Sequence, residues 1–238
     1  MDAADLSAVT TSTAGTVTLT NAQTIAGTGA EVKDALITNP VTLGQASNAT
    51  VSDGISAALA AEIAGVGSIT AAYTTGISDT LANLLNSGQT AINGNVTTAA
   101  GDDTNVNIAI TDNSTTLTAA KLSLITAGTA GTVTLNNSHS ITGNGAQLKA
   151  ALETDPVSAA SGTTATVSDA VTISVANSIA GATNVTASFT SGISDSLGNL
   201  ASGGNADSKL TTVAGDDTNV NITISDNTTT MGAADLSA

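Results

Sequence analysis

The stretch ATVSDGISAALAAEIAGVGSITAAYTTGISDTLANLL, residues 49–85, decides the fold. Its apolar residues first recur at helical spacing, over Ile55–Gly65. A short run rich in β-formers, Ile69–Tyr73, then predicts a strand, and the apolar spacing of Ile77–Leu85 predicts a second helix. Short strands that alternate with short helices are typical of parallel crossover units. This stretch therefore predicts an α/β protein.

The chain repeats itself along its whole length. The repeated segments are AGTVTL at Ala14–Leu19 and Ala130–Leu135, GISD at Gly76–Asp79 and Gly192–Asp195, and GDDTNVNI at Gly101–Ile108 and Gly215–Ile222. The first two pairs lie 116 residues apart (14 to 130, 76 to 192), and the third lies 114 apart (101 to 215). A fixed period over a whole chain is the sequence signature of a repeat array. Arrays of this kind are usually built for length and surface.

Each copy contains about four strand–helix units, of about 29 residues if they share the 116-residue period equally. The sequence predicts a first copy over residues 1–118 and a second over 119–238, joined in one continuous structure. The four helices expected in the first copy are GAEVKDALIT at 29–38, ISAALAAEIAG at 55–65, ISDTLANLL at 77–85 and LTAAKLSLITAG at 117–128.

The architecture favoured by these units is an open right-handed β/α solenoid like that of leucine-rich-repeat proteins, although the leucine-rich consensus is absent. Parallel strands would form one face and short helices the other. A closed eight-unit barrel is a competitor by the number of units. A second competitor is a pair of tandem Ig-like β-sandwich adhesin modules, against which the Ala-rich helical segments argue, since Ala is depleted in strands.

Composition limits the function. Four Lys, no Arg and a net charge of −15 give a surface that repels nucleic acid and anionic lipid. The absence of Cys excludes disulfides and thiolate metal sites. Uncharged stretches are too rich in Gly, Ser, Thr and Asn to insert into a bilayer. An export signal is not recognisable at Met1, so we expect any such signal to lie outside this chain.

Two motifs carry a resemblance to a known class. VSDGIS and ISDTLANLL in the first copy, and VSDAVTISVAN and ISDSLGNLA within Val167–Ser202 of the second, resemble repeat modules of giant secreted or cell-surface proteins of marine cyanobacteria and other Gram-negative bacteria. The resemblance covers about a third of the chain directly. It implies an extracellular structural role, in surface layers, adhesion or motility-linked appendages, and brings no catalytic residues with it.

The GDDTNV segment is the candidate metal site. Its Asp-x-Asn-x-Asn spacing is similar to the first half of a calcium loop, but Ile108 and Ser114 stand where an EF-hand needs Gly and Glu. The alternative is a turn followed by a strand. Calcium is thus the one possible cofactor. The candidate calcium ligands are Asp102, Asp103, Asn105, Asp216, Asp217 and Asn219.

Other polar residues are predicted to be structural. His139, whose counterpart is Gln23, is expected to be an exposed turn residue, and Tyr73 and Phe189 each to fill a gap in an Ala-rich layer. The Gly-rich turns at residues 27–29 and 143–145 lack the Lys of a phosphate loop and are expected to lead into helix starts. Four aspartates are expected at helix starts, where a carboxylate suits free N–H groups: Asp53, Asp79, Asp169 and Asp195.

With one His and no Cys or Arg, most catalytic arrangements lack parts, so no enzymatic activity is expected. The predicted function is a structural repeat segment of an extracellular or cell-surface protein. It would act as a spacer or as a self-stacking block of a surface layer, fibre or filament, with neighbouring repeats or copies of itself as partners. The alternative is an adhesin-like module that binds a glycan, ice or a partner surface.

Overall fold

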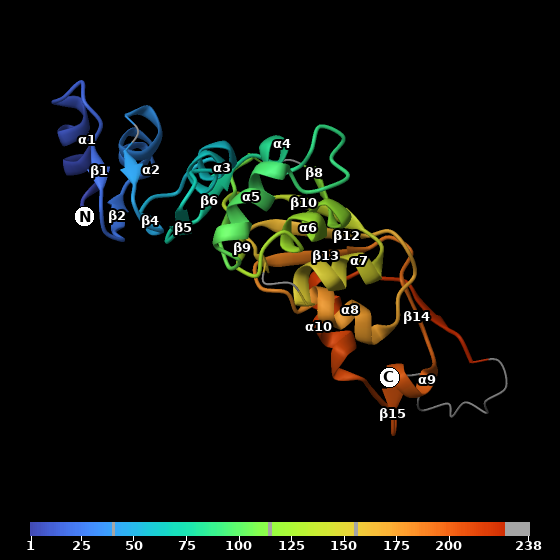
Figure 1. Cartoon of the computed structure of the whole chain (residues 1–238). Coiled ribbons are helices and arrows are strands. Elements are labelled where there is room, and N and C mark those ends of the chain that lie inside the picture. The colour runs from blue at the N-terminus through green and yellow to red at the C-terminus, as the bar shows by residue number, and fades with distance from the viewer. Residues whose placement is uncertain (40, 114–115, 155–156, 227–238) are drawn as a thin grey trace. The chain divides into compact units, whose positions relative to one another are not determined.

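The computed structural model describes residues 1–39, 41–113, 116–154 and 157–226. Within it the chain forms two compact units (Figure 1). Unit 1 comprises residues 1–112 and 124–134, and unit 2 comprises residues 113–123 and 135–238. The predicted copy boundary after residue 118 concerns sequence repeats and stays a prediction.

Unit 1 alternates short strands with short helices. Its first half contains α1 (Ala3–Thr11), β1 (Thr18–Leu19), β2 (Thr24–Gly27), α2 (Gly29–Lys33), the π-helical turn η1 (Asp34–Thr38), β3 (Thr42–Leu43) and β4 (Ser47–Val51). The rest contains α3 (Ala57–Ala64), β5 (Ile69–Tyr73), β6 (Ile77–Asp79), α4 (Leu81–Leu84), α5 (Gly94–Asp102), β7 (Ile108–Ile110) and most of β9 (Val133–Leu135). Helix α6 (Ala119–Thr126) has residues in both units.

Strands of unit 1 pair in parallel with the next strand–helix segment of the chain. β2, β4 and β5 form one sheet, in which Thr24 lies opposite Asn48, and Asn48 opposite Thr70. In this sheet β5 buries alternate residues and exposes the others. The helices α1, α2 and α3 contact one another in chain order (Figure 1). The fold thus places each segment beside its sequence neighbour.

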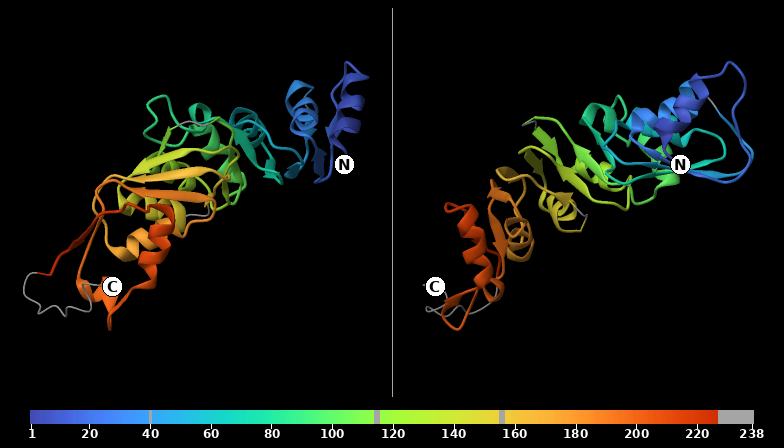
Figure 2. Two further views of the ribbon diagram at one scale, coloured as in Figure 1. Left: turned by 180° about the vertical axis from the view of Figure 1, so that it is seen from behind. Right: turned by 90° about the vertical axis from the view of Figure 1, so that its left-hand side faces the viewer.

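Unit 2 repeats this plan. Its elements are β8 (Thr116–Thr118), β10 (Ser140–Gly143), α7 (Gly145–Lys149), η2 (Ala150–Thr154), β11 (Val157–Ser158), β12 (Thr163–Val167), α8 (Ile173–Ala180), β13 (Val185–Phe189), β14 (Ile193–Asp195), α9 (Leu197–Leu200), β15 (Ala201–Ser202), β16 (Asn205–Ala206), α10 (Ser208–Asp216) and β17 (Ile222–Ile224). The strand order β13-β12-β10-β8 makes a four-stranded parallel sheet, and β14 pairs with β17. Helices α7, α8 and α10 pack in succession beside these strands (Figure 2).

The predicted α/β class is therefore confirmed, with mostly parallel strands in several sheets. The Ig-like alternative does not fit, since an Ig-like sandwich is antiparallel, whereas β2–β4–β5, β8–β10–β12–β13, β6–β7 and β14–β17 pair in parallel. The equal 29-residue interval is wrong. Parallel partners lie 24 residues apart at Thr24 and Asn48, 22 apart at Ser47 and Ile69, and 31 apart at Ile77 and Ile108.

The helix predicted over Ile77–Leu85 is shorter than expected. Ile77–Asp79 form β6, because their alternating side chains are buried in strand fashion, and only Leu81–Leu84 are helical. Among the described residues three helices were not predicted, α1, α5 and α10, and each contains Thr and Asp, which are poor helix formers. The core itself consists of small aliphatic residues, with Tyr73 and Phe189 each only 3 % exposed, which confirms their predicted role as filling residues.

Candidate functional site

Aspartates at the ends of strands bind the main chain of the preceding segment. Asp53 was expected to start the helix that follows it, but its Oδ1 accepts a hydrogen bond from the N–H of Gly29, the first residue of α2, at 2.7 Å. Helix α3 is instead capped by Ser56. Six described aspartates bind a first helical N–H in this way: Asp53 to Gly29, Asp79 to Ala57, Asp112 to Leu81, Asp169 to Gly145, Asp195 to Ile173 and Asp226 to Leu197.

The distance in sequence shows why this pattern escaped prediction. Each carboxylate lies 22 to 31 residues after the amide that it accepts from. An aspartate next to a helix start normally caps its own helix, whereas here the parallel register brings it to the helix start one segment earlier. The positive end of the helix dipole favours the charge in either arrangement. The expectation that these aspartates serve helix starts is thus right about the group bound, but it is wrong about which helix for Asp53 and Asp169.

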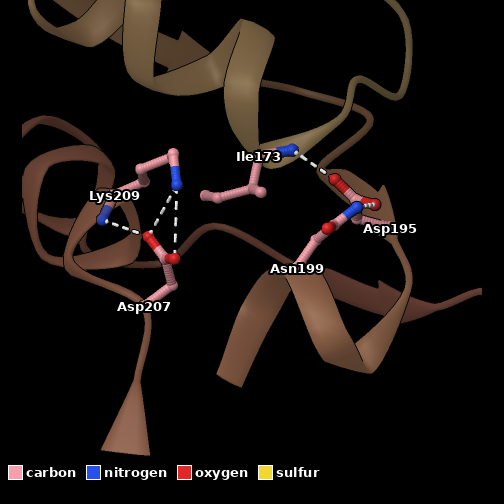
Figure 3. A network of polar contacts seen from close by, with 5 residues as sticks. All are labelled: Ile173, Asp195, Asn199, Asp207 and Lys209. Carbon is pink, nitrogen blue, oxygen red and sulfur yellow. Dashed lines mark hydrogen bonds and ion pairs between the residues drawn. The ribbon is translucent and has the colours of Figure 1, made fainter. Parts of the chain in front are cut away.

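Asp195 serves two helix starts at once (Figure 3). One oxygen accepts from the Ile173 N–H at 3.0 Å, and the other accepts from the Ser196 N–H at 2.8 Å and the Asn199 side-chain amide at 2.7 Å. Burial acts to raise the pKa of Asp195, but these three hydrogen bonds outweigh it and lower the pKa below its ordinary value of 3.8. Asp79 has the same contacts, with Ala57, Thr80 and Asn83. The carboxylate therefore ties one helix start to the next.

Asp207 shows the ordinary, local form of the same chemistry (Figure 3). It caps α10 by accepting from the Lys209 N–H at 2.9 Å, and the Lys209 ammonium lies 3.1 Å from the same oxygen. The backbone hydrogen bond and then the side-chain contact of Lys209 lower the pKa of Asp207. Because this carboxylate is on the surface, water screens the ion pair and its contribution to stability is small.

The GDDTNV aspartates cover the free edge of a sheet. Asp102 accepts from the Ala71 N–H at 2.8 Å, and Asp103 accepts from the Tyr73 N–H at 2.9 Å. Both amides belong to β5, the edge strand of the β2-β4-β5 sheet. An uncovered edge presents unpaired N–H groups that can pair with another chain. The two carboxylates thus take the place of a neighbouring strand.

The second copy repeats this edge contact. Asp216 accepts from the Ala187 N–H and Asp217 from the Phe189 N–H, both at 2.8 Å, at the β13 edge of the four-stranded sheet. The two hydrogen bonds recur at matching positions in both copies, so the paired aspartates have the same backbone-binding role in each. The turn predicted at Gly101–Asp102 is instead the last part of α5.

The calcium assignment stays a prediction. Four of its six candidate ligands are the edge-binding aspartates, and the other two, Asn105 and Asn219, are exposed. Among the described residues, no three His, Cys, Asp or Glu side chains gather into a group that could hold a metal ion. Calcium would therefore have to share carboxylates with backbone N–H groups and use amide or carbonyl oxygens as well. Thermal melting with and without millimolar calcium tests this site, and an unchanged melting temperature would contradict it.

The Gly-rich turns are helix starts, as predicted. Thr28 forms a capping box with Glu31, and Asn144 forms one with Gln147. His139, by contrast, is not an exposed turn residue, because it is buried with an exposed fraction of 2 %. Its carbonyl accepts from the Thr164 N–H, as the carbonyl of its counterpart Gln23 accepts from Asn48. Gln23 and His139 therefore hold the same position directly before a strand, and this position accepts either side chain.

Comparisons with protein-family models, with curated proteins and with solved structures found no match. Across the described part of the chain, no helix has the length and apolar character needed to cross a membrane. The chemistry of the site therefore has to be interpreted from its own geometry. The site consists of carboxylates that accept hydrogen bonds from backbone N–H groups.

Proposed function

We propose that this chain is a structural repeat segment of an extracellular or cell-surface protein, built as one continuous open right-handed β/α solenoid. It acts as a spacer or as a self-stacking block of a surface layer, fibre or filament. The resemblance of the VSD and ISD motifs to giant bacterial surface proteins supplies the cellular setting. This setting also implies export.

The observation that carries the proposal is the repeated aspartate contact between successive segments. In each case the free N–H at one helix start is satisfied by the carboxylate of the next segment, at 2.5 to 3.0 Å. A segment of this kind cannot satisfy its own backbone without a neighbour. Stability that resides in contacts between nearest neighbours is typical of solenoids and allows copies to be added without limit.

The acidic side chains have a structural role, because they accept hydrogen bonds from the backbone. Asp79 and Asp195 each accept three hydrogen bonds from backbone and amide N–H groups. Asp102 and Asp103 each accept one from the backbone. A hydrolase of polysaccharides needs two carboxylates that flank a substrate. We therefore assign these residues to the scaffold and propose no enzymatic activity.

The test is the length of the molecule in solution. We expect small-angle X-ray scattering from the chain, and from a chain lengthened by a further 116-residue copy, to show a maximum dimension that grows in proportion to the number of copies. Unfolding by denaturant should become more cooperative and occur at higher denaturant concentration in the longer chain. A longer chain with an unchanged maximum dimension would contradict the solenoid and the spacer function.

A second candidate function, binding to a glycan, ice or a partner surface, is favoured by hydroxyl rows on the sheet of unit 2. The register aligns Thr116, Ser140, Thr164 and Thr186 in one row and Thr118, Thr142, Thr166 and Ser188 in another. None of the eight is buried, whereas the residues between them are. Inhibition of ice recrystallisation or retention on a glycan column, lost in Thr164→Glu but kept in Thr211→Glu on α10, would support it. No binding to either material would remove it.

A further inference from the structure

Two sequence segments that meet inside unit 1 recur, letter for letter, elsewhere in the chain. TAGTVTL occurs at Thr129–Leu135 and at Thr13–Leu19, and GDDTNVNI occurs at Gly101–Ile108 and at Gly215–Ile222. The inner pair, Gly101–Ile108 and Thr129–Leu135, is in contact through β7 and β9. The outer pair, Thr13–Leu19 and Gly215–Ile222, consists of the same residues. Any contact that the inner pair makes is therefore chemically available to the outer pair.

The inner contact is held by specific hydrogen bonds. The Ala130 N–H donates to the Thr104 carbonyl at 2.8 Å, and the Ile108 N–H donates to the Thr132 carbonyl at 2.9 Å. The Thr132 N–H donates in turn to the Asn107 side-chain oxygen at 2.9 Å. These contacts join two strand edges with a fixed register. Asn107 thus has a defined role in the junction between the two segments.

The outer segments present the same groups without this partner. Among the described residues, β17 is paired with β14 alone, and β1 with β3 alone. Ile222 is 47 % exposed, whereas its inner counterpart Ile108 is 1 % exposed. The exposed large hydrophobic residues of the described chain are Met1, Val9 and Ile222, so all three belong to the first helix region or to the last strand.

The inner and outer segments differ most clearly in the surroundings of two matching glycines, Gly131 and Gly15. A Cβ added at Gly131 would lie 2.3 Å from the Asn105 carbonyl oxygen and 2.6 Å from that of Val106. The counterpart Gly15 would place its Cβ against nothing closer than the Thr13 hydroxyl, at 3.4 Å. Glycine is required at residue 131 by the close approach of a backbone, but no other segment among the described residues approaches residue 15 in this way.

One outer segment borders a largely apolar groove, and the other borders a smaller, mostly polar hollow. A groove of about 470 Å³ is lined by Leu210, Val220 and Ile222, with four smaller residues from β16 and α10 and the turn after it. At the other segment, a hollow of about 170 Å³ is lined by Gly15 and Val17 with three polar neighbours. Val9, close to it in sequence, is 53 % exposed, whereas its counterpart Ile125 is fully buried. Both surfaces thus lack the cover that the inner counterparts have.

We propose that the chain associates head to tail with a second copy of itself, with Thr13–Leu19 of one molecule adding to β17 of the other as β9 adds to β7. The proposal rests on the repeat-segment function and names the surfaces through which stacking occurs. The contact joins two different surfaces, so each added molecule leaves one of each kind free, and the assembly grows into open chains. Because each molecule carries a net charge of −15, salt should strengthen it.

The experiment is sedimentation equilibrium of the purified chain with two blocking variants. Gly15→Ala blocks the N-terminal surface through the clash seen at Gly131, and Ile222→Asp places a charge on the C-terminal surface. We expect species larger than a dimer for the parent chain and a dissociation constant raised about tenfold or more in each variant. Gly67→Ala is the matched control, since a Cβ there meets nothing within 4 Å, and it should assemble like the parent. Circular dichroism melts establish that each variant is folded.

Mixing the two variants decides the geometry of the contact. Gly15→Ala keeps its C-terminal surface and Ile222→Asp keeps its N-terminal surface, so an equimolar mixture should form a heterodimer and nothing larger. Association of either variant alone to the level of the parent would overturn the head-to-tail contact.

The alternative is that the chain's own C-terminal segment covers the surface at Ile222. Deletion of residues 227–238 tests this alternative. A monomeric parent that assembles only after this deletion would overturn the proposal, in favour of the chain's own C-terminal segment as the cover. A parent that stays monomeric, with and without the deletion, would overturn it too. The spacer function would still stand in that case if the scattering dimension grew with copy number.

Discussion

The two copies have different residues at some positions that fill space, but the same residues at the positions whose side chains bind the main chain. Tyr73 and Phe189 occupy matching buried positions, and the half-buried Gln23 matches the buried His139 directly before a strand. The aspartate contacts, in contrast, are the same in residue, atom and approximate distance in both copies. The repeat therefore preserves the backbone acceptors first and the packing only by volume.

Removal of Asp195 should have the largest effect. Asp195→Ala leaves three donors without their acceptor, two of them at helix starts, and we expect a loss of about 2–4 kcal/mol in the free energy of unfolding. Asp79→Ala should cost a similar amount, because its contacts match. Denaturant titration measures both, with the exposed Asp34→Ala as control. A loss below about 0.5 kcal/mol, as for an ordinary surface residue, would contradict the role given to these carboxylates.

The next largest difference in stability is expected between substitutions of Gly131 and Gly15. Gly131→Ala drives a Cβ into two carbonyl oxygens and should destabilise the chain by about 1–3 kcal/mol. Gly15→Ala should be neutral or should stabilise a dilute, unassociated chain by up to about 1 kcal/mol, because it restricts the unfolded state. Equal effects of the two substitutions in thermal melts would show that the inner contact is not what demands glycine.

Loss of the edge acceptors should be smaller in stability and visible in aggregation. Asp103→Ala uncovers the Tyr73 N–H at the edge of β5, at a cost of about 1–2 kcal/mol. The freed edge should also increase thioflavin-positive aggregation on heating. Asp217→Ala should behave alike in the second copy. Light scattering that stays at the level of the parent would argue that the edge is protected by something else.

Acid should remove the contribution of Asp195 selectively. Its folded-state pKa is lowered from 3.8, so its contribution to stability is present above that value and is lost as pH falls through the folded-state pKa. The difference in unfolding free energy between the parent chain and Asp195→Asn should therefore be constant near neutral pH and should shrink below about pH 4. A difference that does not change down to pH 2 would contradict the charged, hydrogen-bonded state.

The smallest effect should come from exchanging the aromatic residues. The Tyr73 hydroxyl donates to the Ala60 carbonyl at 2.6 Å, so Tyr73→Phe should cost about 0.5–1.5 kcal/mol. Burial, with the charges of Asp102 and Asp103, raises the pKa of Tyr73 above its ordinary 10.0. The unfolded chain therefore ionises first, and the parent should lose stability above about pH 10 more steeply than Tyr73→Phe. Parallel profiles would argue against a buried neutral phenol.

The sequence was sufficient for the class of fold and for several elements. Strand Ile69–Tyr73 and the helix within Ile55–Gly65 were predicted because their patterns are local and unmixed. Ile77–Asp79 was predicted as helix, because three residues cannot distinguish the two periods and tertiary pairing with β7 decided the outcome. Helix α5 was missed because Thr, Gly and Asp are weak helix formers, and its packing against α3 overrides them.

The candidate site was predictable in its residues and not in its partners. Asp53, Asp79 and the GDDTNV aspartates stand out by repetition, and their preference for N–H groups at helix starts was anticipated for the first two. Which amide each one binds depends on a register of 22 to 31 residues, which varies from segment to segment. Local capping rules contain no such information. A search for Asp at strand ends, one register step after each helix start, would have found the pattern.

Each segment holds the helix start of the segment before it through a carboxylate. Amide hydrogen exchange, measured by NMR on Asp53→Ala, tests it most directly. We expect the Gly29 amide, 24 residues upstream, to lose protection, while the amides of Ala57 to Ala60 keep theirs. Protection lost at Ala57 to Ala60 and retained at Gly29 would show that Asp53 caps its own helix and does not hold the helix start of the segment before it.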